Sequence, residues 1–283
     1  MQLKFVKMHG LGNDFIVLDH RPGEALLASD QWRELADRHT GVGFDQALLI
    51  EPPRSAGARA SYRVINADGS EVEQCGNGVR CVARLLHERN PALGAEMLLD
   101  SGAGPVRARI LESGDVSIDM GVPDFAPAAL HLDVPAEAQR YGLLVGGTTV
   151  EFGAVSMGNP HAVLTVADVD TAPVATLGPQ LESHPRFRER TNVGFMQIVD
   201  DAHIRLRVFE RGVGETRACG TGACAAVAVG RRHGRLGAHV EVALPGGRLW
   251  IDWPGEGQLL WMTGPAVESF RGQVEIQKER NKA

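Results

Sequence analysis

The sequence of 283 residues predicts an α/β protein built as two similar domains. Three observations predict this fold class. A short stretch with a cysteine before a Gly-x-Gly step occurs twice, as QCGNG at 74–78 and as ACGTG at 218–222. Each copy precedes an apolar segment with helical spacing, between segments that read as strands. Further matches between the halves occur in the same order, which is typical of internal duplication.

The first half is predicted to hold strands around one main helix at 78–89. Val79, Val82 and Leu86 recur at helical spacing, and Asn90-Pro91 ends the helix. A shorter helix is expected at 30–39, with Asp30 as its N-cap. The expected strands are 2–8, 14–20, 47–51, 62–66, 96–100 and 105–120, with a hairpin turn at 113–115.

The second half repeats this order after a Gly- and Pro-containing loop at 121–127. An Ala/Val-rich helix is expected at 222–232, closed at Gly234, and a short helix at 174–181. The expected strands are 148–156, 162–167, 194–199, 203–210, 239–244, 248–252, 259–263 and 265–277. The loop is therefore a candidate domain boundary.

The internal repeat extends beyond the cysteine stretches. The segment 40–46 matches 191–197 at an offset of 151, and Gly12-Asn13 matches Gly158-Asn159 at an offset of 146. Asn66 and Glu210 each lie nine residues before a cysteine of the pair. Two repeats that face each other would place equivalent helix starts on either side of one cleft, and clefts between domains are common ligand sites.

Composition excludes several classes of protein. The net charge of −6 argues against general nucleic-acid binding, which needs a basic surface. The sequence has no stretch of about 18 apolar residues, so no membrane span is expected. Its first apolar run is too short for a signal peptide. We therefore expect a cytoplasmic protein with reduced thiols. Pyridoxal phosphate would need a lysine, and none lies between Lys7 and Lys278.

The two cysteine stretches predict acid–base chemistry. A helix N-terminus carries unpaired N–H groups and partial positive charge, so it favours the thiolate of a cysteine placed there. The glycines let backbone N–H groups approach a carboxylate. Cys75 and Cys219, facing one cleft, could remove a proton from one side of a carbon and return one to the other side, which inverts that carbon.

Other interpretations of the cysteines stay open at this point. Cys81 and Cys224 lie within apolar helical segments and are expected to be small core residues. Neither cysteine spacing is a usual zinc pattern, so no metal is expected. The run 220–225 matches a dinucleotide fingerprint only weakly, because it does not directly follow a strand. A thiol redox protein, with the cysteine pair as a disulfide sensor, is the rival from another class.

The chain resembles the diaminopimelate epimerase family over nearly its whole length. The residues that carry the resemblance are MHGLGNDF at 8–15, GFDQ at 43–46, NADGS at 66–70, QCGNGVRC at 74–81, GNPH at 158–161, TNV at 191–193, ERG at 210–212 and ACGTG at 218–222. The resemblance implies an isomerase that converts LL-2,6-diaminopimelate to the meso form without metal or organic cofactor. This step supplies precursors of lysine and peptidoglycan.

The resemblance also assigns residues. It implies that Cys75 and Cys219 are the acid–base pair, and that Glu210 and His161 assist near the reacting carbon. The backbone N–H groups expected to hold the adjacent carboxylate are those of Gly76, Asn77, Gly220 and Thr221. The side chains expected to line the pocket are Asn13, Gln46, Asn66, Asn159, Asn192, Glu210 and Arg211. An arginine fork suits the distal carboxylate of such a substrate, and a glutamate suits its ammonium group.

By the same resemblance, each domain is a curved, mostly antiparallel sheet wrapped around a central helix. The first domain is expected at 1–120, with 264–283 returning to it, and the second at 121–263. Family members are homodimers, and Phe270 falls at a position of the dimer contact. Proline racemase and hydroxyproline epimerase share the fold and two cysteines, but a Gly-His step is typical of them where this chain has Gly76-Asn77.

Overall fold

The computed structural model describes residues 2–21, 23–72 and 75–276. The described residues within Met1–Ile118 and Gly264–Ala283 form one compact unit, unit 1, and Asp119–Thr263 form unit 2. The sequence predicts the first boundary two residues later, between 120 and 121. Gln74 of the first cysteine stretch and the chain from 277 onward, where the last expected strand ends, lie outside the described residues.

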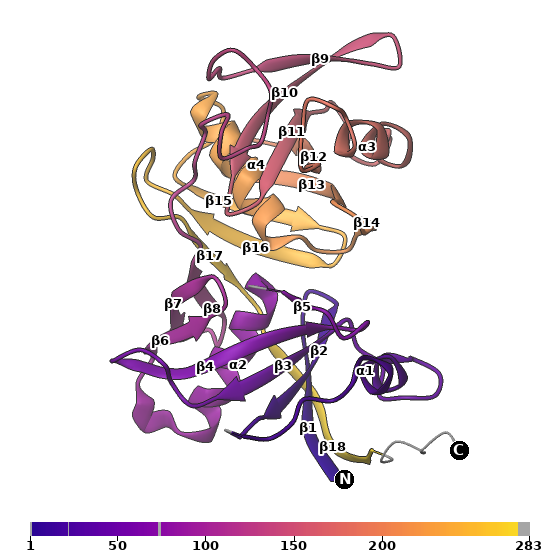
Figure 1. The fold of residues 1–283 in the computed structure, drawn as a ribbon. Helices are drawn as coiled ribbons and strands as arrows, with labels where there is room; N and C mark the ends of the chain where they lie inside the picture. The colour runs from indigo at the N-terminus through magenta and orange to yellow at the C-terminus, as the bar shows by residue number, and fades with distance from the viewer. Residues whose placement is uncertain (1, 22, 73–74, 277–283) are drawn as a thin grey trace, which may run out of the picture. The chain divides into compact units, whose positions relative to one another are not determined.

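Unit 1 wraps its strands around α2, Gly76–Arg89, which packs against β1, β2, β3 and β7 (Figure 1). Its other elements are β1 Gln2–Gly10, β2 Asn13–Asp19, α1 Ser29–Ala36, β3 Gln46–Glu51, β4 Ala58–Asn66, β5 Glu71–Val72, the 3₁₀ helix Pro91–Leu93, β6 Glu96–Ser101, β7 Gly104–Ile110, β8 Val116–Asp119 and β18 Val267–Glu275. Val79, Val82 and Leu85 of α2 are fully buried, because their helical spacing places them on the face toward the sheet.

Unit 2 has α4, Gly220–Arg232, in the same place, packed against β10, β11, β12 and β16. Its other elements are β9 Tyr141–Val145, β10 Thr148–Ser156, β11 Pro160–Thr165, α3 Val174–Glu182, β12 Asn192–Ile198, β13 His203–Glu210, β14 Gly214–Thr216, β15 His239–Leu244, β16 Gly247–Asp252 and β17 Trp261–Gly264. The Ala/Val-rich sequence makes α4 apolar on all sides, and residues 222–230 are buried throughout.

The strand pairing of the second unit repeats that of the first. In unit 1 the successive pairs β1–β2, β2–β3, β3–β4, β4–β6 and β6–β7 are antiparallel, parallel, antiparallel, parallel and antiparallel. The pairs β10–β11, β11–β12, β12–β13, β13–β15 and β15–β16 follow the same order. The predicted α/β fold with two domains on one plan is therefore confirmed.

Strand register corrects one predicted match. Gln46 lies opposite Phe15 in the parallel pair β2–β3, and Asn192 lies opposite His161 in the parallel pair β11–β12. The equivalent of Gln46 is therefore Asn192, at an offset of 146, and the match at an offset of 151 that pairs it with Gln197 is wrong. Similar sequences at 40–46 and 191–197 do not reveal which residue faces which neighbour, because 40–46 is mostly loop and 191–197 is mostly strand; hydrogen bonding between strands does reveal it.

Two local predictions are also corrected. Helix α1 begins at Ser29 and ends at Ala36, and its N-cap is Ala28 rather than Asp30. The Gln31 side-chain oxygen accepts the N–H of Ala28, so the helix is capped two residues before Asp30. Strand β9 was not predicted. Its buried Tyr141, Leu143 and Val145 alternate with exposed neighbours, but one of these neighbours is the apolar Leu144, so the sequence lacks the apolar–polar alternation of a half-buried strand.

Candidate active site

Each cysteine of the repeated stretch is the N-cap of the central helix of its unit. Cys75 and Cys219 both have extended backbone conformations, and α2 and α4 begin at the next residue. The sequence predicted these helices to start two residues later. The N–H groups of the first helical residues have no acceptor within their helix, so those of Gly76, Asn77, Gly220 and Thr221 are suited to an anion at each cysteine.

Unit 1 brings two predicted amide side chains to Cys75. The Cys75 thiol donates to the Asn13 carbonyl oxygen across 3.7 Å, and the Asn77 amide donates to the same oxygen across 3.2 Å. Asn13 is the first residue of β2, and Asn77 lies in the first turn of α2. The helix start and the strand start therefore build one polar cluster around this sulfur.

A second pair of predicted residues lies on the adjoining strands. Gln46 and Asn66 lie opposite each other where β3 begins and β4 ends, and the Gln46 amide donates to the Asn66 oxygen across 2.9 Å. The Asn66 amide in turn donates to the Ser70 hydroxyl, and that hydroxyl donates to Asp68. Because Asp68 can only accept, the orientation of every group in this series is fixed.

Cys219 in unit 2 is almost fully buried, with 4% of its surface exposed. Burial raises the pKa of its thiol well above the usual range, and the negative charge of Glu210 raises it further, against opposing hydrogen bonds from Thr221 and Gly222. The sulfur lies 3.6 Å from the Thr221 hydroxyl. The expectation of a favoured thiolate is therefore wrong for Cys219, because desolvation outweighs the helix N-terminus.

Two further predicted residues of unit 2 form a pair. The Nε2 atom of His161 lies 3.0 Å from the Asn159 carbonyl oxygen. Burial lowers the pKa of His161 to about 3, and the positive charge of Arg211 acts in the same direction. The imidazole is therefore neutral at neutral pH and donates to Asn159 from Nε2, so it is not a cationic acid.

Asn192 and Arg211 are joined through the backbone. The Asn192 carbonyl oxygen accepts the N–H of Arg211 across 3.0 Å, and its amide donates to the carbonyl oxygen of Pro160. The sequence missed Glu182, which is 3% exposed and accepts the N–H of Gly212 across 2.9 Å. A glutamate at the end of the apolar helix α3 was the available signal, because buried charges are rare unless they have partners.

The predicted site residues occupy equivalent positions in the two units. By strand pairing, helix start and sequence offset, the equivalent pairs are Asn13 and Asn159, Gln46 and Asn192, Asn66 and Glu210, Cys75 and Cys219, and Asn77 and Thr221. Each unit therefore contributes a cysteine at a helix start with a polar set on the adjoining strands. The differences between them, Glu210 for Asn66 above all, give the two cysteines different electrostatic surroundings.

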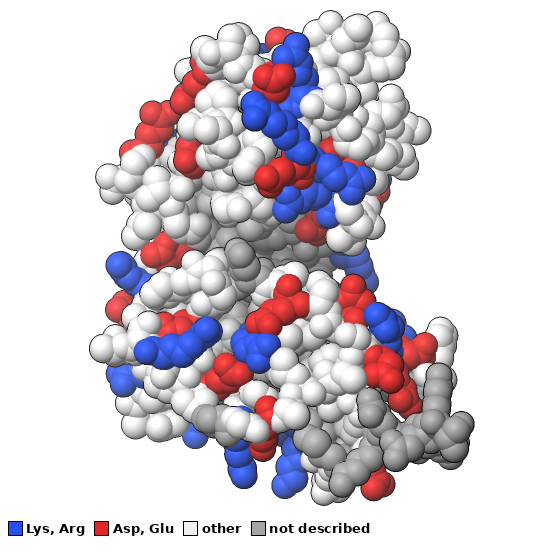
Figure 2. All heavy atoms as spheres, viewed as in Figure 1, with Lys and Arg blue, Asp and Glu red and all other residues white. Residues whose placement is uncertain are grey.

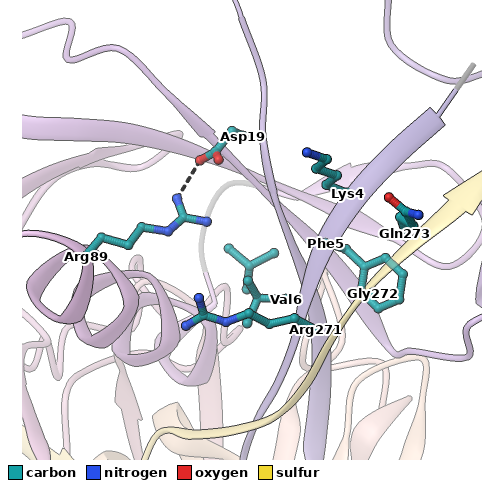
Figure 3. A pocket seen from close by; sticks show the side chains of 9 residues that line it. Lys4, Phe5, Val6, Asp19, Arg89, Arg271, Gly272 and Gln273 are labelled. Atoms are coloured by element: carbon teal, nitrogen blue, oxygen red, sulfur yellow. Dashed lines mark hydrogen bonds and ion pairs between the residues drawn. The ribbon is translucent and has the colours of Figure 1, made fainter.

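Phe270 lies away from these clusters, on β18. It is half exposed and meets the Phe5 ring edge-on at 5.9 Å. Beside it, a pocket of about 440 Å³ opens between β1, β18 and the end of α2 (Figure 3). Arg89 in this pocket is paired with Asp19 at 2.7 Å. No predicted catalytic residue lines the pocket.

The surface and the described helices add two observations. On the face in view, lysine and arginine side chains are interspersed with aspartate and glutamate, so neither sign dominates it (Figure 2). None of the helices formed by the described residues is long and apolar enough to cross a membrane. Within the same part of the chain, no group of three or more His, Cys, Asp or Glu side chains is arranged to hold a metal.

The fold is that of a class of epimerases, racemases and related isomerases. It matches a hydroxyproline epimerase from Agrobacterium vitis with a TM-score of 0.66, at 16% identity over 96% of this chain and 92% of that one. A probable proline racemase from Agrobacterium radiobacter matches with a TM-score of 0.66, at 18% identity over 99% of this chain and 94% of that one. At these identities the likeness concerns the fold alone.

Sequence comparison is more specific. The family model for diaminopimelate epimerase matches residues 5–126 and 153–268. Diaminopimelate epimerases from Pseudomonas paraeruginosa and Alkalilimnicola ehrlichii are each 52% identical, over 98% of this chain and the whole of theirs. The chain belongs to the diaminopimelate epimerase family, and it is an isomerase.

Proposed function

We propose that the chain inverts one α-carbon of LL-2,6-diaminopimelate to give meso-diaminopimelate, with Cys75 and Cys219 as the acid–base pair. The observation that carries this proposal is that both cysteines are N-caps of equivalent helices, each beside equivalent polar side chains. The substrate follows from the family and from the named relatives. The product would enter lysine and peptidoglycan synthesis.

The proposed reaction has two proton transfers. A thiolate takes the α-proton, so the C–H bond breaks, an S–H bond forms and the electron pair spreads onto the adjacent carboxylate. The opposite thiol then gives its proton to the other face of the carbon, which forms a new C–H bond and leaves a thiolate. The helix-start N–H groups at Gly76, Asn77, Gly220 and Thr221 would hold the carboxylate as its charge grows.

The structure of unit 2 favours one order of events in the first turnover. Cys219 is a thiol in the substrate-free protein, because burial and Glu210 raise its pKa. We infer that Cys219 is the proton donor in that turnover and that Cys75 is the base. Cys75 would then hold the abstracted proton and Cys219 would be a thiolate, so before the next turnover Cys75 releases a proton to solvent and Cys219 takes one up.

The remaining predicted residues would bind the two ends of the substrate. Glu210 offers a carboxylate for the ammonium group at the reacting carbon, and neutral His161, whose N–H is given to Asn159, adds no positive charge that would repel that ammonium group. Arg211 would hold the distal carboxylate with its guanidinium. The amides expected to line the rest of the pocket are Asn13, Gln46, Asn66, Asn159 and Asn192.

Assembly and location are part of the same proposal. The exposed Phe270 ring on β18 is suited to a contact between two copies of the chain, and Phe270→Asp is expected to give monomers in sedimentation velocity. The proposed chemistry needs both sulfurs reduced, as they are in the cytoplasm. No organic cofactor takes part in the proposed steps.

The proposal is tested by four matched substitutions. Cys75→Ala and Cys219→Ala should each lower kcat for LL-diaminopimelate about a thousandfold, since each removes one proton-transfer group. Cys81→Ala and Cys224→Ala serve as controls, because both sulfurs are fully buried in the core and burial raises the pKa of Cys81 to about 12.

The controls should keep kcat within about threefold. Equal losses in all four variants would contradict the assignment. Proline epimerisation, or thiol–disulfide turnover without an amino acid, would identify one of the rival functions instead.

A further inference from the structure

Four side chains of unit 1 form a continuous series of hydrogen bonds that passes Cys75. Arg80 donates to the Asn77 carbonyl oxygen across 2.8 Å, and the Asn77 amide donates to the Asn13 oxygen across 3.2 Å. The Asn13 amide donates to the Asp45 carboxylate across 3.0 Å. We call this series, Arg80–Asn77–Asn13–Asp45, the amide chain.

The ends of the amide chain fix its direction. A guanidinium only donates hydrogen bonds and a carboxylate only accepts them, so neither amide between them can turn over without losing a bond at each side. Asp45 is itself held by Arg38 at 2.7 Å and by the N–H of Asp14 at 3.1 Å. Arg80 is fully buried and also donates to the carbonyl oxygen of Pro265.

The consequence concerns the atom that Cys75 meets. With the amide chain intact, Asn13 presents its carbonyl oxygen to the sulfur, at 3.7 Å, and its NH₂ group points to Asp45. If Asn13 turned over, its NH₂ group would face the sulfur. An NH₂ donor would hydrogen-bond the thiolate, which makes that thiolate more populated but weaker as a base toward a carbon acid.

We propose that Asp45 and Arg80 are positioning residues for proton transfer at Cys75, which hold Asn13 and Asn77 so that the carbonyl oxygen of Asn13, and not its NH₂ group, faces the sulfur. The inference rests on the proposed function and goes beyond it, because it gives a role to two residues outside the proposed acid–base pair and the proposed pocket.

Unit 2 shows that the fold does not require this chain. The positions equivalent to Asn77 and Arg80, at an offset of 144, hold Thr221 and Cys224. Cys219 lies 3.6 Å from the Thr221 hydroxyl, which can rotate and can either donate or accept. The equivalent helix α4 packs without such a chain, so packing alone does not require it. The fixed hydrogen-bond direction in unit 1 therefore distinguishes Cys75 from Cys219.

The first test is Asp45→Asn, which keeps the shape but allows Asn13 to turn over. Two readouts should move in opposite directions. Carboxymethylation of Cys75 in the substrate-free protein at neutral pH should become about fivefold faster, the factor expected for one new hydrogen bond to the thiolate. The kcat for epimerisation should fall about tenfold, with KM changed less than about threefold.

Asp30→Asn is the matched control, because its carboxylate accepts the N–H of Gln31 at the start of α1 and takes no part in the amide chain. Both readouts should stay at the wild-type values in this variant. A fall in kcat with no change in the Cys75 alkylation rate would mean a merely structural role and would overturn the inference. Unchanged values of both in Asp45→Asn would overturn it as well.

A second test reverses the direction of the amide chain. In the double variant Asp45→Asn with Asn77→Asp, the new asparagine can donate to the Asn13 oxygen, and Asn13 can donate to the new aspartate beside Arg80. Each single substitution should lower the thermal midpoint, and the double variant should recover part of that loss while kcat stays low.

Additive losses in the midpoint, or recovery of kcat together with stability, would contradict the inference. Alkylation and stability are measured without substrate. They therefore test the amide chain even if the wild-type protein does not epimerise diaminopimelate. That failure would overturn only the proposed function.

Discussion

At the scale of single residues, Cys219 shows two opposing effects on one sulfur. Its place at the start of α4 offers N–H groups and partial positive charge, which favour a thiolate. Its burial and the nearby Glu210 favour the thiol, and they dominate. A site that keeps this proton until the substrate arrives has its acid already in place.

Replacement of Glu210 by Gln tests this balance. Removal of the negative charge should lower the pKa of the Cys219 thiol, since a like charge no longer opposes ionisation. Alkylation of Cys219 by iodoacetamide, followed by mass spectrometry over pH 6–10, should therefore begin at lower pH in Glu210→Gln than in the wild type. Cys75 in the same samples is the internal control. An unchanged Cys219 profile would mean that Glu210 has no influence on this sulfur.

The sequence alone predicted candidate site residues but not their surroundings. The repeated Cys-Gly-x-Gly stretch indicated both cysteines and the helices that follow them, because this short pattern can be recognised from neighbouring residues alone. Three features depend on residues far away in the sequence: the burial of Cys219, the neutral state of His161 and the hydrogen bond from Gly212 to Glu182. A local sequence pattern does not predict how deeply distant strands will bury a side chain.

At the scale of elements, close packing holds each cysteine against its helix. A Cβ atom on Gly222 would lie 3.1 Å from the Cys219 sulfur and 3.0 Å from Val208. A Cβ atom on Gly78 would lie 2.9 Å from Leu48. Because the second glycine of each Gly-x-Gly step has no side chain, the strand side chains can pack directly against the start of the helix.

Gly222→Ala should displace the Cys219 sulfur. We expect kcat to fall about tenfold, because small errors in the position of a reacting group are costly, while the gain in helix propensity offsets part of the strain in stability. Gly194→Ala on β12 is the control, since a Cβ atom there meets nothing closer than 3.5 Å. Wild-type kcat in Gly222→Ala, measured with LL-diaminopimelate, would show that the sulfur has room to move.

Elements were predicted best where the pattern was long. The central helices were found within two residues of their starts, because apolar spacing continues over several turns. Strand partners were not predictable: the similarity between 40–46 and 191–197 suggested one register, and the parallel pairs β2–β3 and β11–β12 have another. Register depends on which faces of the strands are buried, and two segments of similar sequence do not report it.

At the scale of the whole molecule, the ion pairs of the partly buried Asp14 link stability to pH. Burial alone would raise the pKa of Asp14, but hydrogen bonds from Arg38 and Lys7 outweigh it and lower that pKa to about 2. A carboxyl with a lowered folded-state pKa adds stability above its unfolded pKa of about 4, and that stability is lost as pH falls toward 2.

Acid unfolding of Asp14→Asn tests this linkage. The variant should be less stable than the wild type at pH 7, because Lys7 loses its carboxylate partner, and its stability should vary less between pH 4 and pH 2. Circular dichroism during urea unfolding at each pH measures both effects. Asp19→Asn, which changes an exposed pair with Arg89, should follow the wild-type curve. Parallel curves for Asp14→Asn and the wild type would contradict the assigned shift.

The central claim is that two sulfurs serve opposite faces of one carbon, and isotope transfer from solvent tests it most directly. The reduced protein is mixed with LL-diaminopimelate in D₂O, and both isomers are analysed at low conversion. We predict meso product with deuterium at the inverted α-carbon, while the remaining LL substrate keeps its protium, because the donor sulfur carries a solvent deuteron. Meso product that retains the substrate proton, or the absence of deuterium from both isomers, would contradict the account.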